Sequence, residues 1–213
     1  MKFRAALFDL DGTLTDPAEG ITNSVKYALK KFGVTVNDAR SLYKFIGPPL
    51  AESFSEFYGF DKEKSLLAVK FFREYFAEKG IWENVKYDGA DELLNELKNR
   101  RVLLALATSK PTVYAQKILT AFGLAKYFDA VVGSELDGRL TDKAEIIAAA
   151  LKKLCVSHAN AVMVGDRKHD VIGAKKNGVN SVGVLYGYGG KKELSDAGAD
   201  FFADSPAQIL DFI

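Results

Sequence analysis

Residues 8–16 read FDLDGTLTD and follow directly on the apolar residues 5–7. A short apolar run that ends in turn-forming residues is typical of a buried β-strand. Asp9 and Asp11 are two positions apart, so they lie on the same side of an extended chain, where their charges repel unless a cation or a turn separates them. The end of this first strand is therefore a candidate functional site.

The composition of the chain excludes several classes of protein. Of its 213 residues 48% are apolar, which is enough for a packed core and argues against wholesale disorder. A net charge of +1 with interspersed signs lacks the basic surface of a nucleic-acid-binding or membrane-surface protein. Cys155 has no partner for an intrachain disulfide, and no apolar run approaches the roughly 18 residues of a membrane span. We therefore expect a soluble cytoplasmic protein, and its oligomeric state is left open.

Short apolar runs alternate with helical patterns along much of the chain. Asp142 and Glu145 have the spacing of a capping box at the start of one expected helix. Several of the apolar runs are continuous, as in parallel strands that are covered on both faces. The pattern predicts an α/β fold, an open Rossmann-like parallel sheet with helices on both faces. The expected strands are residues 4–10, 102–107, 130–132, 161–164 and 181–185, with a weaker one at 200–203.

Residues 16–87 interrupt this alternation. They contain no convincing strand, and apolar residues such as Ile21, Val25 and Leu29 recur at helical spacing. Fourteen of the 25 aromatic residues lie in these 72 positions, so the segment is expected to have its own core. We predict an inserted all-helical cap domain at 16–87, within an α/β catalytic core domain formed by 1–15 and 88–213.

Polar residues follow three of the expected strands. Asp9 and Asp11 follow the first, residues 108–110 (Thr-Ser-Lys) the second, and Asp166 and Asp170 the strand at 161–164. Ligands of open α/β sheets bind beyond the carboxyl ends of the strands, so these groups are expected to meet at one edge. Carboxylate clusters suit hard cations such as Mg²⁺. Alternatively, each aspartate only caps a helix or shapes a turn.

Two further positions have alternative interpretations. Thr108 and Ser109 could donate hydrogen bonds to a phosphate at the start of a helix, with Pro111 in its first turn. The alternative is that Ser109 is an ordinary N-cap residue of that helix. Lys143 lies at another helix start, where its charge opposes the helix dipole and contributes no helix stability, although a solvated surface lysine is the commoner case. Residues 187–190 (Gly-Tyr-Gly-Gly) form a loop and do not match a dinucleotide-binding fingerprint.

Together these segments resemble the haloacid dehalogenase-like (HAD) superfamily of phosphohydrolases with a helical cap. DLDGTLTD resembles the first motif of that family, and the threonine of LALATSK the second. Lys143 in LTDKAEII resembles the third motif, and VGDRKHD has the G-D-x-x-x-D spacing of the fourth. The four motifs occur in the family's order along essentially the whole chain.

The resemblance implies a role for each matching residue. Asp9 would be the nucleophile that forms an aspartyl-phosphate, and Asp11 the general acid and base. Thr108 and Ser109 would bind phosphate, and Lys143 would offset the charge of the nucleophile and the phosphate. The metal site for Mg²⁺ would be formed by Asp9, Asp11 through its backbone carbonyl, Asp166 and Asp170.

The resemblance also implies a substrate class, namely a small phosphorylated metabolite. A phosphoglycolate phosphatase-like activity is the leading expectation, followed by a 5′-nucleotidase-like activity. The alternatives are a sugar-phosphate mutase of the β-phosphoglucomutase kind, a dehalogenase, for which the Mg²⁺-binding acids would be unnecessary, and a catalytically silent binding protein on the same scaffold. In the cap, Lys44, Gly47 and Pro48 are candidates for substrate selection, although the same residues are also consistent with a simple turn between helices.

Overall fold

The computed structural model describes residues 3–213, so the first two residues of the predicted core domain lie outside the described residues. The chain divides into two compact units. An α/β unit contains Asp16 and the residues before it together with Lys86–Ile213, and a helical unit contains Pro17–Val85.

A six-stranded sheet forms the centre of the α/β unit, and all its neighbouring strands are parallel. The strand order is β5-β4-β1-β6-β7-β8, which places the first strand in the interior of the sheet. The predicted open parallel sheet is thus confirmed. The strands are β1 (Ala5–Phe8), β4 (Leu103–Pro111), β5 (Ala130–Ser134), β6 (Ala161–Gly165), β7 (Asn180–Val184) and β8 (Phe201–Ala203).

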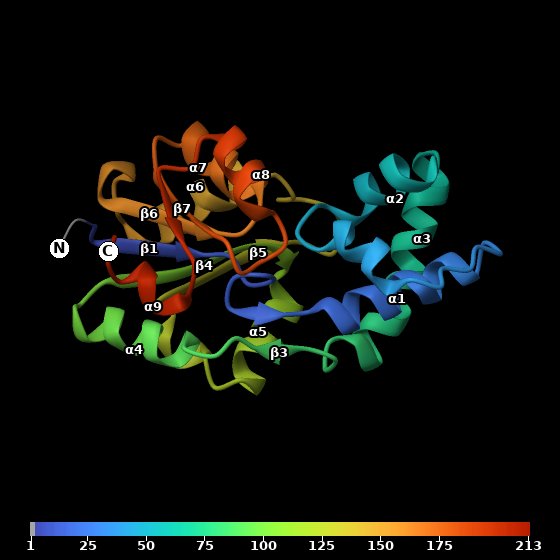
Figure 1. The fold of residues 1–213 in the computed structure, drawn as a ribbon, viewed down its shortest axis with the longest axis horizontal. Coiled ribbons are helices and arrows are strands. Elements are labelled where there is room, and N and C mark those ends of the chain that lie inside the picture. The colour runs from blue at the N-terminus through green and yellow to red at the C-terminus, as the bar shows by residue number, and fades with distance from the viewer. Residues whose placement is uncertain (1–2) are drawn as a thin grey trace. The chain divides into compact units, whose positions relative to one another are not determined.

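Helices cover both faces of this sheet (Figure 1). One face carries α4 (Ala90–Asn99), α5 (Thr112–Ala121) and α9 (Pro206–Ile209). The other carries α6 (Lys143–Leu154), α7 (Lys168–Lys176) and α8 (Gly190–Ala197). Short 3₁₀ turns precede two strands, η3 (Ala125–Tyr127) before β5 and η4 (His158–Asn160) before β6.

The burial of β1 explains its continuous apolar sequence. All four of its residues are fully buried, because Ala5 and Leu7 join a cluster with α6 residues such as Ile147 on one face while Ala6 and Phe8 point to the other. A strand in this position is held by neighbours on all sides. The residues that follow it, including Asp9, therefore start from a fixed point.

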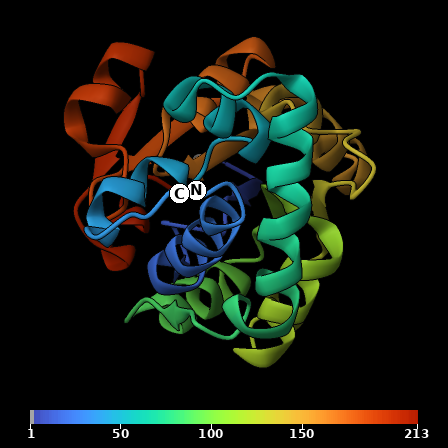
Figure 2. The ribbon, with the colours of Figure 1, turned by 90° about the vertical axis from the view of Figure 1, so that its right-hand side faces the viewer.

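The helical unit has a core of its own. Its elements are α1 (Ala18–Lys30), η1 (Ala39–Phe45), α2 (Leu50–Tyr58), α3 (Lys62–Tyr75) and a π-helical turn, η2 (Phe76–Gly80). Helices α1 and α3 lie side by side (Figure 2). The rings of Phe54 and Phe60 stack with centroids 6.1 Å apart, and Phe45 meets Phe54 edge-on at 5.0 Å. Within residues 3–213, none of the helices has the length and apolar character that a membrane span requires.

Two short strands lie where no strand was predicted, at the points where the chain passes between the units. They are β2 (Thr15–Asp16) and β3 (Val85–Lys86), and they pair with each other. Each has only two residues, so neither shows the alternation by which a strand is recognised in a sequence.

The contact between α1 and η2 gives a test of the packing in the helical unit. A methyl group at Gly20 would overlap the backbone oxygen of Gly80, and a backbone atom cannot rotate away. We expect Gly20→Ala to lower the free energy of unfolding of this unit by about 3 kcal/mol. Gly59→Ala is the control, because Gly59 faces open space and has a φ of 63°, so that only backbone strain of about 1 kcal/mol applies. Equal losses in thermal unfolding would contradict the packing described here.

Candidate active site

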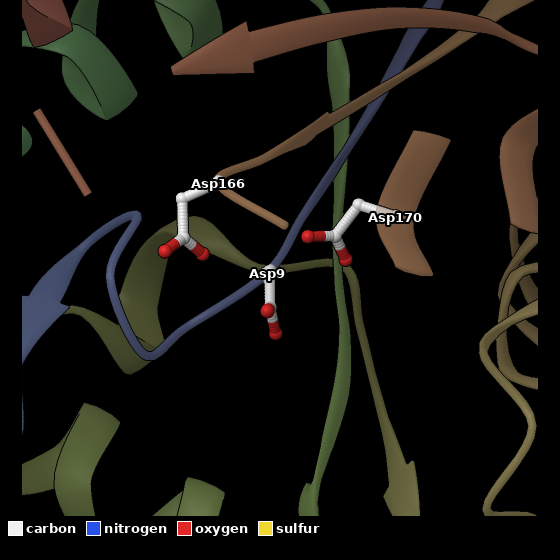
Figure 3. Close-up of side chains that lie close together, drawn as sticks. All are labelled: Asp9, Asp166 and Asp170. Atoms are coloured by element: carbon white, nitrogen blue, oxygen red, sulfur yellow. The ribbon is translucent and has the colours of Figure 1, made fainter. Parts of the chain in front are cut away.

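Three aspartates meet at the carboxyl ends of two neighbouring strands. Asp9 follows β1, Asp166 follows β6, and Asp170 lies in the first turn of α7, which follows β6. Phe8 pairs with Val164, so the two strands end at the same level. Each aspartate can offer a carboxylate oxygen such that all three oxygens lie within 4.8 Å of one another, and all three side chains are buried (Figure 3).

Lys143 carries a buried positive charge into this cluster. It is the first residue of α6 and is 4% exposed, so it is not a solvated surface lysine. Its Nζ lies 3.0 Å from Oδ1 of Asp9 and 2.8 Å from Oδ1 of Asp170, and it donates a hydrogen bond to the carbonyl of Ala107. Burial alone would lower the pKa of Lys143, but the charges of Asp170 and Asp9 outweigh it and raise that pKa. The ammonium group is therefore always charged at neutral pH.

Asp11 forms a second buried ion pair, with Lys110. Nζ of Lys110 lies 2.7 Å from Oδ2 of Asp11, and both side chains are largely buried. Burial raises the pKa of Asp11, and the charge of Lys110 opposes that rise. No role was predicted for Lys110 from the sequence. Its position as the third polar residue after a buried strand was the only available signal.

The segment after Ala107 differs from the prediction. Strand β4 continues to Pro111, and α5 begins at Thr112 with Pro111 as its N-cap residue. The expectations of Ser109 as an N-cap and of Pro111 in the first helical turn are therefore wrong.

Pairing with β5 extends β4 in this way. At Gly133 of β5 a methyl group would overlap the carbonyl oxygen of Lys110, so glycine lets the two strands approach. Oγ of Ser134 then donates a hydrogen bond of 2.8 Å to the carbonyl of Ser109. Thr108 is buried, and its Oγ1 accepts a hydrogen bond from the amide of Lys110. Phosphate binding by Thr108 and Ser109 stays a prediction.

Asp166 and Asp170 each use one oxygen to bind the main chain. Oδ2 of Asp170 accepts from the amide of Arg167 (3.1 Å), so Asp170 caps α7 and also faces the cluster. Oδ2 of Asp166 accepts from the amide of Tyr188 (2.8 Å). Burial raises the pKa of Asp170 to about 6, although the charge of Lys143 acts to lower it. Burial also raises the pKa of Asp166, and the negative charges of Asp170 and Asp9 raise it further. The capping and metal-binding interpretations of Asp170 are thus compatible.

The charges of the site fit a divalent cation. Four buried carboxylates, of Asp9, Asp11, Asp166 and Asp170, face two buried ammonium groups, of Lys110 and Lys143. When all are ionised, an excess of two negative charges is left. Oδ1 of Asp166 is buried and accepts no hydrogen bond. Oxygen ligands with excess negative charge are the donor set that Mg²⁺ prefers, so Asp9, Asp166 and Asp170 are suited to hold it.

The three residues that were predicted to select the substrate lie in the helical unit. Lys44 lies in η1 and is exposed, with its Nζ 4.3 Å from the centroid of the Phe57 ring. Gly47 has a φ of 101°, which favours glycine, and Pro48 follows it, partly buried. Substrate selection by these three residues stays a prediction.

Comparison with known proteins identifies the family. The sequence model of the haloacid dehalogenase-like hydrolases matches residues 6–184, which include every residue of the acidic cluster. This chain belongs to the haloacid dehalogenase-like hydrolases. The resemblance inferred from the four motifs is therefore confirmed.

Other members of the family are similar over most of the chain. A 5′-nucleotidase of Pseudomonas aeruginosa is 46% identical over 91% of this chain and 88% of its own length. A phosphoglycolate phosphatase of Colwellia psychrerythraea is 31% identical, with 96% and 94% covered. The tyrosine-protein kinase PtkA of Mycobacterium tuberculosis is 38% identical over 86% of this chain, which spans only 62% of that protein.

A solved structure with a closely similar fold is that of a predicted phosphatase from Clostridium acetobutylicum. It is 50% identical, with a TM-score of 0.96 over 99% of this chain and 100% of the other. The family's α/β core and its helical unit are thus present in this chain.

The charge balance predicts opposite effects of two substitutions on the metal-free protein. Asp166 has a pKa in the folded state above its unfolded value. Between those two pKa values the folded protein binds more protons, so its stability falls as the pH rises. At neutral pH in EDTA we expect Asp166→Asn to raise the free energy of unfolding by about 1 kcal/mol or more. That gain should shrink as the pH falls and Asp166 becomes protonated.

Lys143→Met should act in the other direction. It leaves the buried carboxylates of Asp9 and Asp170 without their cation, and we expect it to lower the free energy of unfolding by about 3–5 kcal/mol. Chemical denaturation of both variants in EDTA measures these effects. Destabilisation by Asp166→Asn at neutral pH, or no loss with Lys143→Met, would contradict the charge balance.

Proposed function

We propose that this protein is a Mg²⁺-dependent phosphatase that hydrolyses small phosphomonoesters through an aspartyl-phosphate on Asp9. The observation that carries the proposal is the buried carboxylate of Asp9, 3.0 Å from the ammonium group of Lys143 and in one acidic cluster with Asp166 and Asp170. Phosphoryl transfer depends on positioning and charge neutralisation, and this arrangement provides for both.

In the first step a carboxylate oxygen of Asp9 attacks the phosphorus atom of the substrate. The bond from phosphorus to the ester oxygen breaks, and Asp11 gives its proton to the leaving alkoxide. In the second step Asp11 takes a proton from water, which attacks the same phosphorus atom. The bond between phosphorus and Asp9 breaks, and inorganic phosphate leaves with Asp9 again a carboxylate and Asp11 again protonated.

The other residues hold the charges in place during these steps. Lys143 offsets negative charge on Asp9 and on the phosphoryl group, and Lys110 keeps the carboxyl group of Asp11 in a fixed orientation. Thr108 and Ser109 bind phosphoryl oxygens from the end of β4. Asp9, Asp166, Asp170 and the backbone carbonyl of Asp11 would hold Mg²⁺, which would neutralise charge on the phosphoryl oxygens.

A 5′-mononucleotide is the leading candidate for the substrate. The relative named 5′-nucleotidase is 46% identical to this chain, whereas the relative named phosphoglycolate phosphatase is 31% identical. Phosphoglycolate is the second candidate, because the relative named phosphoglycolate phosphatase matches 96% of the chain.

We also propose a cytoplasmic location, since the lone Cys155 is an exposed free thiol that is stable in a reducing compartment.

A panel of phosphorylated compounds tests the proposed activity. The purified protein is assayed for phosphate release with Mg²⁺ and with EDTA, on 5′-mononucleotides, phosphoglycolate, hexose phosphates and phosphotyrosine. We expect the fastest release from a 5′-mononucleotide and no release in EDTA. Asp9→Asn, which keeps the shape of the side chain, should reduce turnover by about a thousandfold or more. Full activity of this variant, or no metal-dependent release from any compound, would contradict the proposal.

Substrate selection by the helical unit is tested through Lys44. We expect Lys44→Ala to raise KM and change the order of preference among phosphorylated substrates, because it removes an exposed cation of the kind that binds anionic substrates. Lys31→Ala is a matched control, since Lys31 is also in the helical unit and also lies over an aromatic ring, at 4.8 Å from Tyr27. Identical KM values and preferences for Lys44→Ala and the unaltered protein would rule out this role.

A further inference from the structure

The loop after β7 lies so close to Asp166 that two of its residues have no room for a side chain. We call residues 187–189 the Asp166 strap. A methyl group at Gly187 would overlap Cβ of Asp166, and one at Gly189 would overlap the main-chain oxygen of Asp166. Neither glycine has a positive φ, so backbone conformation does not require glycine at these positions. Glycine is required there because the loop backbone lies directly against Asp166.

The strap also fixes the orientation of the Asp166 carboxylate. The amide of Tyr188 donates a hydrogen bond of 2.8 Å to Oδ2 of Asp166. A methyl group at Gly12 would also overlap Oδ2. Oδ1 is left buried and without a hydrogen-bond partner, in the cluster with Asp9 and Asp170. Two glycine-containing loops thus lie against the side chain, and one of its oxygens faces the cluster.

Side chains near the strap anchor it within the α/β unit. The hydroxyl of Tyr186 donates a hydrogen bond of 2.9 Å to the carbonyl of Thr13, and the hydroxyl of Tyr188 bonds to Asp16. On the other flank, Oε1 of Glu193 accepts from Nε of Arg167 (2.9 Å) and from the amide of Lys168 (2.8 Å). The strap is therefore tied to the segment after β1 and to the start of α7, the two segments that carry the acidic cluster.

We propose that the Asp166 strap is a positioning element for the cation site. It holds the Asp166 carboxylate in the one orientation that presents Oδ1 to a divalent cation together with Asp9 and Asp170. Groups that orient a metal ligand contribute to metal affinity although they do not touch the metal. This inference rests on the proposed function, because it assigns the strap to the Mg²⁺ site of that function.

Gly187→Ala and Gly189→Ala test the inference, with Gly190→Ala as the control. Gly190 is the first residue of α8, directly after the strap, and faces open space, and its φ of 70° means that alanine there adds backbone strain without touching Asp166. Binding of Mg²⁺ is measured by isothermal titration calorimetry, without substrate. We expect Kd for Mg²⁺ to rise by about 10–100-fold in Gly187→Ala and Gly189→Ala. We expect Gly190→Ala to bind Mg²⁺ like the unaltered protein.

Thermal unfolding with and without Mg²⁺ gives a second measurement. In the two strap variants the increase in Tm caused by Mg²⁺ should shrink, in addition to any loss of Tm that the overlapping methyl groups cause in EDTA. In activity assays the Mg²⁺ concentration needed for half-maximal rate should rise more than kcat falls. Should an alanine variant fail to fold, Glu193→Gln weakens the anchor without adding atoms beside Asp166, and it too should raise Kd for Mg²⁺.

The outcomes separate the two proposals. If the unaltered protein does not bind Mg²⁺, the proposed function fails at its metal site. If it binds Mg²⁺ and the folded strap variants bind it with the same affinity as Gly190→Ala, the proposed function stands and the strap has no positioning role.

Discussion

Lys143 places a buried positive charge between two buried carboxylates, 3.0 Å from Asp9 and 2.8 Å from Asp170. Without this charge the two acids could not both stay ionised in the interior, because an unpaired buried charge is strongly destabilising. The sheet order makes the contact possible. Strand β1 lies in the middle of the sheet, so α6 starts above its carboxyl end and delivers Lys143 to Asp9. The proposed nucleophile, Asp9, is one partner in these ion pairs.

One lysine is not enough to balance the site. Lys110 pairs with Asp11, and when all four buried acids are ionised two negative charges remain. A cation of charge two compensates for this excess, and the Asp166 carboxylate, with one oxygen bonded by the Asp166 strap and one free of hydrogen bonds, is the natural additional ligand. The arrangement of buried charges that destabilises the metal-free protein is thus the same one that would bind the proposed metal.

The sequence predicted those features of the structure that depend on residues close together in the chain. Apolar runs predicted all six strands of the main sheet, the one at 200–203 more weakly, and the positions of Asp9, Asp166 and Asp170 after two of these strands predicted their meeting at one edge. The rest depends on contacts between distant segments. The Lys110–Asp11 pair and the Asp166 strap join residues far apart in the chain, and the extension of β4 to Pro111 depends on Gly133 in the next strand. Such contacts cannot be predicted from the periodicity of a short segment. The motifs likewise do not indicate which substrate is preferred.

The most direct test of the account is chemical trapping of the phosphorylated enzyme. The protein is mixed with Mg²⁺ and a 5′-mononucleotide, quenched in acid during turnover and treated with borohydride, which reduces an aspartyl-phosphate to homoserine. Mass spectrometry of the peptides then locates the modified residue. The account predicts homoserine at position 9 and at no other aspartate, with none formed when substrate is omitted. Reduction at another residue, or an unmodified Asp9 under conditions of rapid turnover, would contradict it.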